Sequence, residues 1–207
     1  MIVMDKIDFT EKTKKHFDDI AADYAYSSDG RFCEPGYLPM VNELKNYASG
    51  KWLDLSCGTG TVLEMLADSK LEKYGIDFSE KMIAEARRRL GDKAQLYVAP
   101  AETMPFADDT FDIITCSFAF HHYVHPAAVL QELHRILKPN AKLIIVDPFI
   151  PQPFRFFMNP LLRFSNNGDY HMYGRHELKK LLCQHGFLMQ EFNRIDKRIF
   201  YSKSTAI

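Results

Sequence analysis

The chain has 207 residues, 46% of them hydrophobic and 26% charged, with a formal net charge of -1. This length and balance fit one globular domain over residues 1–207, and the near-zero charge gives no electrostatic case for nucleic-acid binding. Four cysteines without a CxxC pair, and the absence of a signal peptide or a membrane-length apolar run, lead us to expect a cytoplasmic protein with reduced thiols and no membrane span.

The first quarter of the chain is expected to be helical. Apolar residues recur at helical spacing among charged ones over about residues 10–25, which predicts an amphipathic helix. Residues 30–39 contain several glycines and prolines and predict a loop, and residues 38–48 predict a second helix. We therefore expect N-terminal cap helices within about residues 10–48.

Strands and helices alternate from residue 51 onward. Several of the strands are almost continuously apolar, as is typical of a parallel sheet buried on both faces. Ser79 is a good N-cap for the helix that follows it. The predicted strands are 51–55, 73–76, 95–98, 111–117 and 141–146, and the predicted helices are 61–71, 80–90 and 127–137.

The C-terminal part departs from this alternation. Residues 187–194 and 198–202 predict two strands joined by a short turn, so the last strand should run antiparallel to its neighbour. Residues 149–173, rich in Phe, Pro, Met, Leu and Arg, are too many for a simple connection. This lid-like insertion begins at the carboxyl end of a strand, where open α/β sheets bind ligands, so we expect it to cap a substrate pocket.

A glycine turn follows the first strand, in the sequence WLDLSCGTG of residues 52–60. Gly58 and Gly60 remove side chains where the backbone turns sharply and approaches a ligand. The helix after the turn directs free N–H groups at the ligand. Asp77 ends the next strand, where a carboxylate can accept hydrogen bonds from both hydroxyls of a ribose. The pattern predicts a site for a cofactor that contains adenosine.

The turn differs from a dinucleotide fingerprint. That fingerprint requires G-x-G-x-x-G, so that pyrophosphate can rest on the helix N-terminus. Here Ser56 occupies the first glycine position, and Asp54 ends the strand. A carboxylate there would repel pyrophosphate but suits an ammonium group. A ligand with an amino-acid tail and an adenosine head satisfies both demands, and S-adenosylmethionine (SAM) is such a ligand.

At these residues the chain resembles the class I SAM-dependent methyltransferases, whose first motif is D/E-x-G-x-G-x-G. Three further segments look like those of the small methyltransferases of quinone biosynthesis: FDDIAADY at 17–24, AETMPF at 101–106 with DTFD at 109–112, and ELHRILKP at 132–139. The resemblance implies a Rossmann-like, doubly wound α/β sheet of seven mostly parallel strands in a three-layer sandwich, with an antiparallel C-terminal strand. It also implies SAM as cofactor and S-adenosylhomocysteine as product.

The resemblance assigns roles to individual residues. Asp54 is expected to bind the methionine ammonium group, although a strand-end acid can instead cap nearby N–H groups. Asp77 is expected to bind the ribose, and Phe78 and Met82 to flank adenine unless they are core residues. Pro100 stands where related proteins often have an aspartate that recognises adenine, which leaves that task to Ala101 and Glu102. The full expected cofactor set is Tyr24, Asp54, Ser56, Cys57, Gly58, Gly60, Asp77, Phe78, Met82, Ala101, Glu102, Ser117 and Phe118.

The histidines of the segment HHYVH at 121–125 raise the possibilities of a metal site and of acid–base chemistry. No carboxylate or cysteine lies close to them in the sequence to complete a ligand set, and related proteins commonly have histidines here without a metal, so we expect no metal. The segment follows the end of a strand, which favours a histidine beside the transferring methyl group. No single catalytic residue is predicted, and the candidates are Tyr24, His121, His122, His171 and Tyr173.

The sequence therefore predicts an enzyme that methylates a small molecule with an apolar or aromatic part. Two alternatives stay open. One is a SAM-binding protein without transferase activity, such as a sensor or a partner subunit. The other is an NAD-dependent oxidoreductase, which Ser56, Asp54 and the C-terminal hairpin disfavour.

Overall fold

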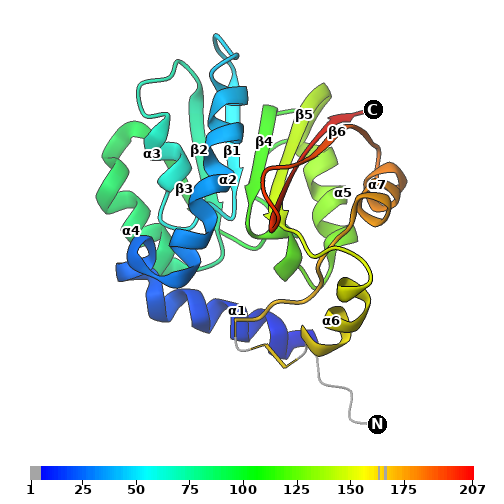
Figure 1. Ribbon diagram of the computed structural model, residues 1–207. Helices are drawn as coiled ribbons and strands as arrows, with labels where there is room; N and C mark the ends of the chain where they lie inside the picture. Colours follow the sequence, from blue (N-terminus) through cyan, green and yellow to red (C-terminus); the bar gives the residue numbers. More distant parts are fainter. Residues whose placement is uncertain (1–5, 163, 166) are drawn as a thin grey trace.

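The computed structural model describes residues 6–162, 164–165 and 167–207, which form a seven-stranded sheet between two layers of helices (Figure 1). The strand order is β3-β2-β1-β4-β5-β7-β6, and β7 pairs antiparallel with both β5 and β6, whereas the other neighbours are parallel. The predicted class I sheet and its reversed last strand are confirmed. The strands are β1 Lys51–Leu55, β2 Glu72–Asp77, β3 Gln95–Val98, β4 Phe111–Ser117, β5 Leu137–Pro148, β6 Phe187–Arg194 and β7 Ile199–Ala206.

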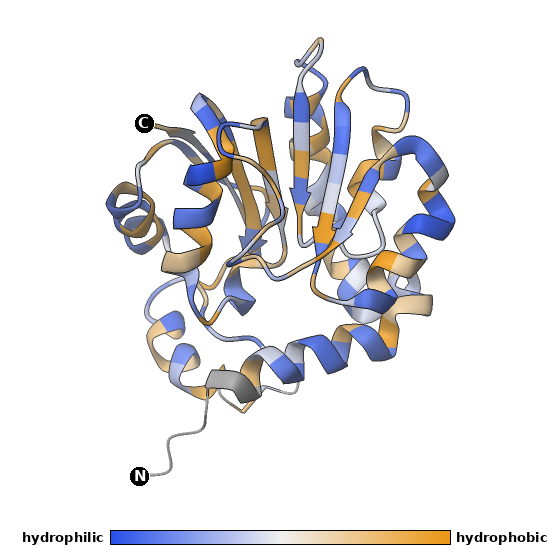
Figure 2. Ribbon diagram, turned by 180° about the vertical axis from the view of Figure 1, so that it is seen from behind, coloured by the Kyte–Doolittle hydropathy of each residue, from blue (hydrophilic) through white to orange (hydrophobic). Residues whose placement is uncertain are grey.

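The helices cover both faces of the sheet, and the core lies between them and the strands. Apolar residues of α2, α3 and α4 pack on one face, and those of α5 and α7 pack on the other. Figure 2 shows the apolar strands between helices whose outward surfaces are more polar. The helices are α1 Lys6–Ile20, α2 Ser28–Leu44, α3 Thr61–Met65, α4 Glu80–Leu90, α5 Pro126–Ile136, α6 Phe154–Leu162 and α7 Arg175–Gln184, with 3-10 turns at Ala21–Tyr26, Gly91–Lys93 and Phe120–His122.

The strand order reverses its direction between β1 and β4. From β1 the chain proceeds outward to β2 and β3, and from β4 it proceeds the other way to β5. The turns that follow β1 and β4 therefore diverge, which opens a crevice at the carboxyl ends of these strands. Helix α1 runs across that end of the sheet (Figure 1). The fold thus places the site between the strand ends and the N-terminal helices.

The predicted loop at residues 30–39 is wrong, because these residues lie inside α2. Their glycines serve close packing. A Cβ atom on Gly36 would lie 2.5 Å from the ring of Phe118, and one on Gly30 would lie 2.2 Å from the carbonyl oxygen of Tyr24. Pro35 and Pro39 also lie within the helix, where tertiary contacts override their low helix propensity.

Helix α3 ends at Met65, earlier than the predicted residue 71. In the segment that follows, the ammonium group of Lys73 donates to the carbonyl oxygens of Ser69 (2.8 Å) and Leu71 (2.9 Å). These bonds hold the turn that leads from α3 into β2. No helix in the described part of the chain is long and apolar enough to cross a membrane.

Candidate active site

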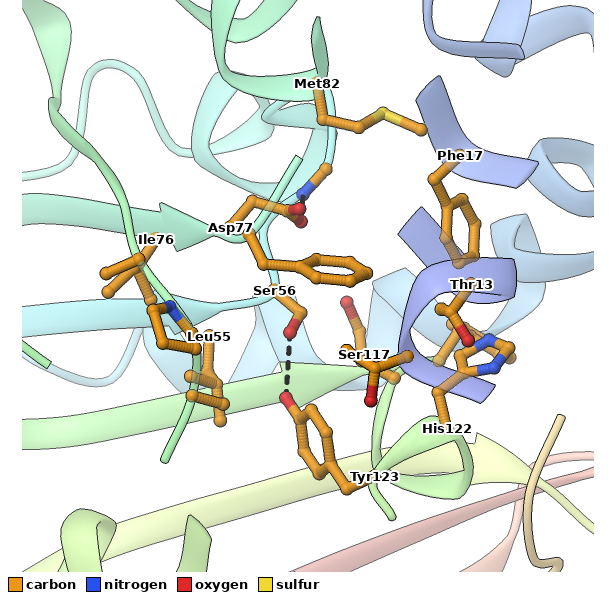
Figure 3. A pocket seen from close by; sticks show the side chains of 18 of the residues that line it. Thr13, Phe17, Leu55, Ser56, Ile76, Asp77, Met82, Ser117, His122 and Tyr123 are labelled. Carbon is orange, nitrogen blue, oxygen red and sulfur yellow. Dashed lines mark hydrogen bonds between the residues drawn. The ribbon is translucent and has the colours of Figure 1, made fainter. Parts of the chain in front are cut away.

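An open cavity lies at the carboxyl ends of β1, β2 and β4 (Figure 3). Most of the predicted cofactor residues line it, and they come from the 3-10 turn after α1, the glycine turn, the end of β2, the start of α4, the segment after β3 and the end of β4. Those that do are Tyr24, Ser56, Gly58, Asp77, Phe78, Met82, Ala101, Glu102, Ser117 and Phe118.

Asp77 joins the glycine turn to the start of α4. One of its carboxylate oxygens accepts the backbone N–H of Gly58 (2.9 Å) and the other that of Ser79 (2.9 Å). The hydroxyl of Ser79 in turn accepts the N–H of Met82 (3.1 Å), which confirms the predicted N-cap. Each carboxylate oxygen keeps a free lone pair, so both can still accept a ribose hydroxyl.

Burial raises the pKa of Asp77 to about 6, although the hydrogen bonds from Ser79 and Gly58 act to lower it. The folded apoprotein therefore holds this proton more tightly than the unfolded chain does, and the resulting stabilisation is lost as the pH rises through about 6. A ligand that needs the carboxylate must bind more weakly as the pH falls through the same value.

We expect the affinity for SAM to fall about tenfold between about pH 7.5 and about pH 5, because most of the Asp77 side chains become protonated over that interval. Calorimetric titration at several pH values measures this. In Asp77→Asn, which cannot titrate at this position, the corresponding part of the pH dependence should vanish. An equally steep decline in that variant would contradict the assignment.

Ser56 adopts a left-handed backbone conformation, with φ at +53°. Glycine would be favoured at this position, since residues with a Cβ atom are strained in that region. The Ser56 hydroxyl shares a hydrogen bond of 2.8 Å with the hydroxyl of Tyr123 (Figure 3). Tyr123 lines the cavity but was not among the predicted residues, because no local pattern joins the two positions.

The left-handed backbone at Ser56 predicts that replacement by glycine gives a more stable protein than replacement by alanine, the reverse of the usual order. Ser56→Gly and Ser56→Ala both lose the hydrogen bond to Tyr123, but only the alanine keeps the left-handed strain. We expect Ser56→Ala to be less stable than Ser56→Gly by about 1 kcal/mol. Urea denaturation of both variants compares them directly, and an alanine variant more stable than the glycine variant would show that the turn is unstrained.

Asp54, Cys57 and Gly60 lie behind the cavity wall. Asp54 is buried and accepts the Thr115 hydroxyl (2.8 Å), which itself accepts the indole N–H of Trp52 (2.8 Å). Burial raises the pKa of Asp54 to about 7. Gly60, with φ at +77°, packs its Cα against Leu90 and not against the cavity.

A second cavity adjoins the first. The two have Phe17, Tyr24, Phe118 and His122 in common. The remaining walls come from α2, the 3-10 turn after β4, the end of β5 and the segment after α6. They are Asp29, Phe32, Cys33, His121, Pro148, Asn167, Asp169 and Met172.

Three of the five predicted catalytic candidates lie at these cavities: Tyr24, His121 and His122. The other two lie elsewhere. His171 donates to Glu177 (2.6 Å), and the ring of Tyr173 packs against that of Phe120 in the core. Burial raises the pKa of Tyr24 well above its usual value, so its phenol remains protonated and can act as a hydrogen-bond donor.

His121 lies between two carboxylates from distant parts of the chain. Its Nδ1 donates to Asp147 (2.9 Å), and its Nε2 lies 3.3 Å from Asp169. Burial acts to lower the pKa of His121, but the two carboxylates outweigh it and raise that pKa to about 10. His122 donates from Nδ1 to the carbonyl of Gly168 (3.1 Å). Neither carboxylate adjoins the histidines in the sequence.

The insertion of residues 149–173 meets the second cavity only in part. Asn167, Asp169 and Met172 line it, whereas α6 lines neither cavity. The side chain of Asn159 fastens α6 by bonding both backbone polar groups of Met172. Phe156 and Phe157 of α6 are 71% and 65% exposed to solvent.

The strand order, the reversed β7, the glycine turn and the acid at the end of β2 together define a class I SAM-dependent methyltransferase. The dinucleotide-binding sheet lacks the reversed strand. The nicotinamide alternative therefore finds no support in this fold.

Comparison with known proteins agrees. A family model described as a methyltransferase domain matches residues 53–145. The demethylmenaquinone methyltransferase of Thermotoga maritima is 32% identical over 185 residues, which cover 78% of this chain and 79% of that protein. That of Clavibacter sepedonicus is 41% identical over 102 residues, covering 48% and 42%. The chain thus spans about half the length of the first curated relatives.

The fold is also shared with a solved structure, the 1,6-didemethyltoxoflavin-N1-methyltransferase of Burkholderia thailandensis with bound 1,6-didemethyltoxoflavin and S-adenosylhomocysteine. Its TM-score is 0.77 at 15% identity, over 100% of this chain and 92% of that one. The chain belongs to the class I SAM-dependent methyltransferase family and is related to the demethylmenaquinone methyltransferases.

Proposed function

We propose that this chain transfers the methyl group of SAM to a small-molecule acceptor that has an apolar or aromatic part. The observation that carries the proposal is the junction of two cavities. The first is lined by the glycine turn and Asp77, and the second meets it at Phe17, Tyr24, Phe118 and His122. A donor in the first cavity would therefore present its methyl group to an acceptor in the second.

Methyl transfer places modest demands on the protein. The acceptor atom forms a bond to the methyl carbon while the bond from that carbon to the sulfonium sulfur breaks. The sulfur keeps the electron pair, and S-adenosylhomocysteine leaves. Because SAM is already activated, the protein acts mainly by aligning the three reacting atoms. Tyr24 and His122 line both cavities, which supports a role for them in contact with the acceptor beside the methyl group.

One side of the second cavity favours an acceptor with a flat, apolar part. The rings of Phe32 and Phe118, which both line it, pack edge-on against each other (centroid distance 5.9 Å). Such rings provide a surface on which another ring can pack. Two relatives carry names that refer to ring compounds, demethylmenaquinone and 1,6-didemethyltoxoflavin, which supports an aromatic acceptor here as well.

Methyl transfer can be tested with SAM carrying a labelled methyl group and a panel of quinol, phenol and amine acceptors. We expect labelled product with at least one aromatic member. Phe32→Ala should raise the KM for that acceptor and leave SAM affinity unchanged, since Phe32 lines only the second cavity. Met82→Ala, which alters only the first cavity, is the matched control and should do the reverse.

The alternative function is a SAM-binding protein without transferase activity. Such a protein would bind SAM in the first cavity, as the proposed enzyme does, but its second cavity would have no role. Tight SAM binding without transfer to any acceptor of the panel would favour this alternative.

A further inference from the structure

His121, His122 and Asp169 form a compact group at the second cavity. The Asp169 carboxylate oxygen lies 3.3 Å from His121 Nε2 and 3.8 Å from His122 Nδ1. One ligand-type atom from each residue lies within 4.8 Å of the other two. The two histidines occupy the 3-10 turn after β4, and Asp169 comes from the segment after α6.

These separations suit a tetrahedral metal ion. A zinc ion binds imidazole nitrogen and carboxylate oxygen at about 2.0–2.2 Å, which places neighbouring ligand atoms about 3.3 Å apart. The shorter observed separation equals this value, and the longer one exceeds it by about half an ångström. All three ligand atoms lie within 4.8 Å of one another, so binding an ion requires the side chains to draw closer together.

Asp147 supplies the outer contact that metal-binding histidines usually have. It is fully buried and accepts the Nδ1–H of His121, so the Nε2 lone pair of the neutral ring would point toward Asp169. Such carboxylate–histidine pairs fix the ring and increase its basicity toward a metal. The other carboxylate oxygen of Asp147 is buried and has no hydrogen-bond partner among the described residues. Two carboxylates thus flank the imidazoles, and a dication would balance their charge.

We propose that His121, His122 and Asp169 bind a divalent cation of the zinc class, with its fourth position open to the second cavity. Three protein ligands with one open position are typical of catalytic zinc sites. The ion would bind the oxygen or sulfur of an acceptor and stabilise its deprotonated form. That role rests on the proposed methyl transfer, whereas the binding of the cation does not.

Loading the site requires two exchanges. The cation replaces the proton that now lies between His121 Nε2 and Asp169. It also takes the lone pair of His122 Nδ1, which must release its hydrogen bond to the Gly168 carbonyl. The absence of a carboxylate near HHYVH in the sequence led us to expect no metal, but the fold brings Asp169 and Asp147 to these histidines.

The test is a titration of the metal-stripped, full-length protein with Co²⁺ alone, followed by visible absorption. We expect one equivalent to produce the intense bands of tetrahedral Co²⁺, and Zn²⁺ to abolish them by displacement. Asp169→Asn should weaken Co²⁺ binding at least 100-fold, and Asp147→Asn about 10- to 100-fold. His125→Gln is the matched control, because this exposed histidine lies outside the cluster and should bind Co²⁺ as the unaltered chain does.

Each variant is also titrated with SAM, which reports folding and the first cavity independently of the metal. Retained SAM binding with lost Co²⁺ binding supports the cation site. Weak, octahedral-type absorption that is insensitive to Asp169→Asn would overturn it and leave a proton-bridged ion pair in its place. If the unaltered chain did not bind SAM, this result would contradict the proposed function and not the cation site.

Discussion

Replacing Asp77 with alanine is expected to raise the dissociation constant for SAM about 10- to 100-fold, which corresponds to about 1–3 kcal/mol. The carboxylate is buried, lines the first cavity and keeps lone pairs for two ribose hydroxyls. It also holds the N–H groups of Gly58 and Ser79, so alanine would loosen both the glycine turn and the start of α4. Isothermal titration with SAM measures the change.

Two further variants separate these contributions. Asp77→Asn keeps the size of the side chain but loses its charge and one acceptor, and should fall between alanine and the unaltered chain. Asp92→Asn alters an exposed acid in the turn after α4, away from the cavity, and should leave the affinity unchanged. If Asp77→Ala bound SAM as tightly as the unaltered chain, Asp77 would not belong to the site.

Trp52→Ala should lower the free energy of unfolding by about 3–5 kcal/mol, the usual cost of deleting a large aromatic side chain from a core. Trp52 is completely buried on β1, among apolar residues from α2, α3 and α4. Among the residues described, its indole N–H is the only group that donates to the Thr115 hydroxyl, and this hydroxyl donates in turn to the Asp54 carboxylate. Chemical denaturation monitored by circular dichroism gives the value.

Trp52→Phe distinguishes packing from hydrogen bonding. It keeps most of the ring volume but removes the donor to Thr115, so we expect a smaller loss of stability, about 1–2 kcal/mol. If Asp54 takes part in SAM binding, this variant should also weaken that binding slightly. Equal destabilisation by phenylalanine and alanine would mean that the hydrogen bond, and not the packing, dominates at this position.

The sheet could be predicted almost completely from the sequence, because its signals are local. The bounds of β3, β4, β6 and α4 agree with the predicted ranges, since apolar runs, a good N-cap and turn residues lie within each segment. The loop predicted at residues 30–39 failed for a tertiary reason. Gly36 is needed for contact with Phe118, and no local pattern reports this contact.

The candidate site also has one part that local sequence predicts and another part that depends on tertiary contacts. The residues of the glycine turn and Asp77 follow a motif with fixed spacing, and three of them, Ser56, Gly58 and Asp77, line one cavity. The partners of Ser56 and His121 could not be predicted. Tyr123 lies 67 positions from Ser56 and Asp147 lies 26 positions from His121, so only the assembled sheet brings these side chains together. The position of Asp54 behind the cavity wall could not be predicted either, because it depends on a hydrogen bond to Thr115 on the neighbouring strand β4.

Titration of the purified chain with SAM, S-adenosylhomocysteine and NADH in parallel tests the central claim most directly. All three compounds contain adenosine, so the test shows which of them the first cavity binds. The geometry of the glycine turn and Asp77 predicts saturable 1:1 binding of SAM and S-adenosylhomocysteine, competition between them, and no binding of NADH. Binding of NADH without binding of SAM would contradict the account.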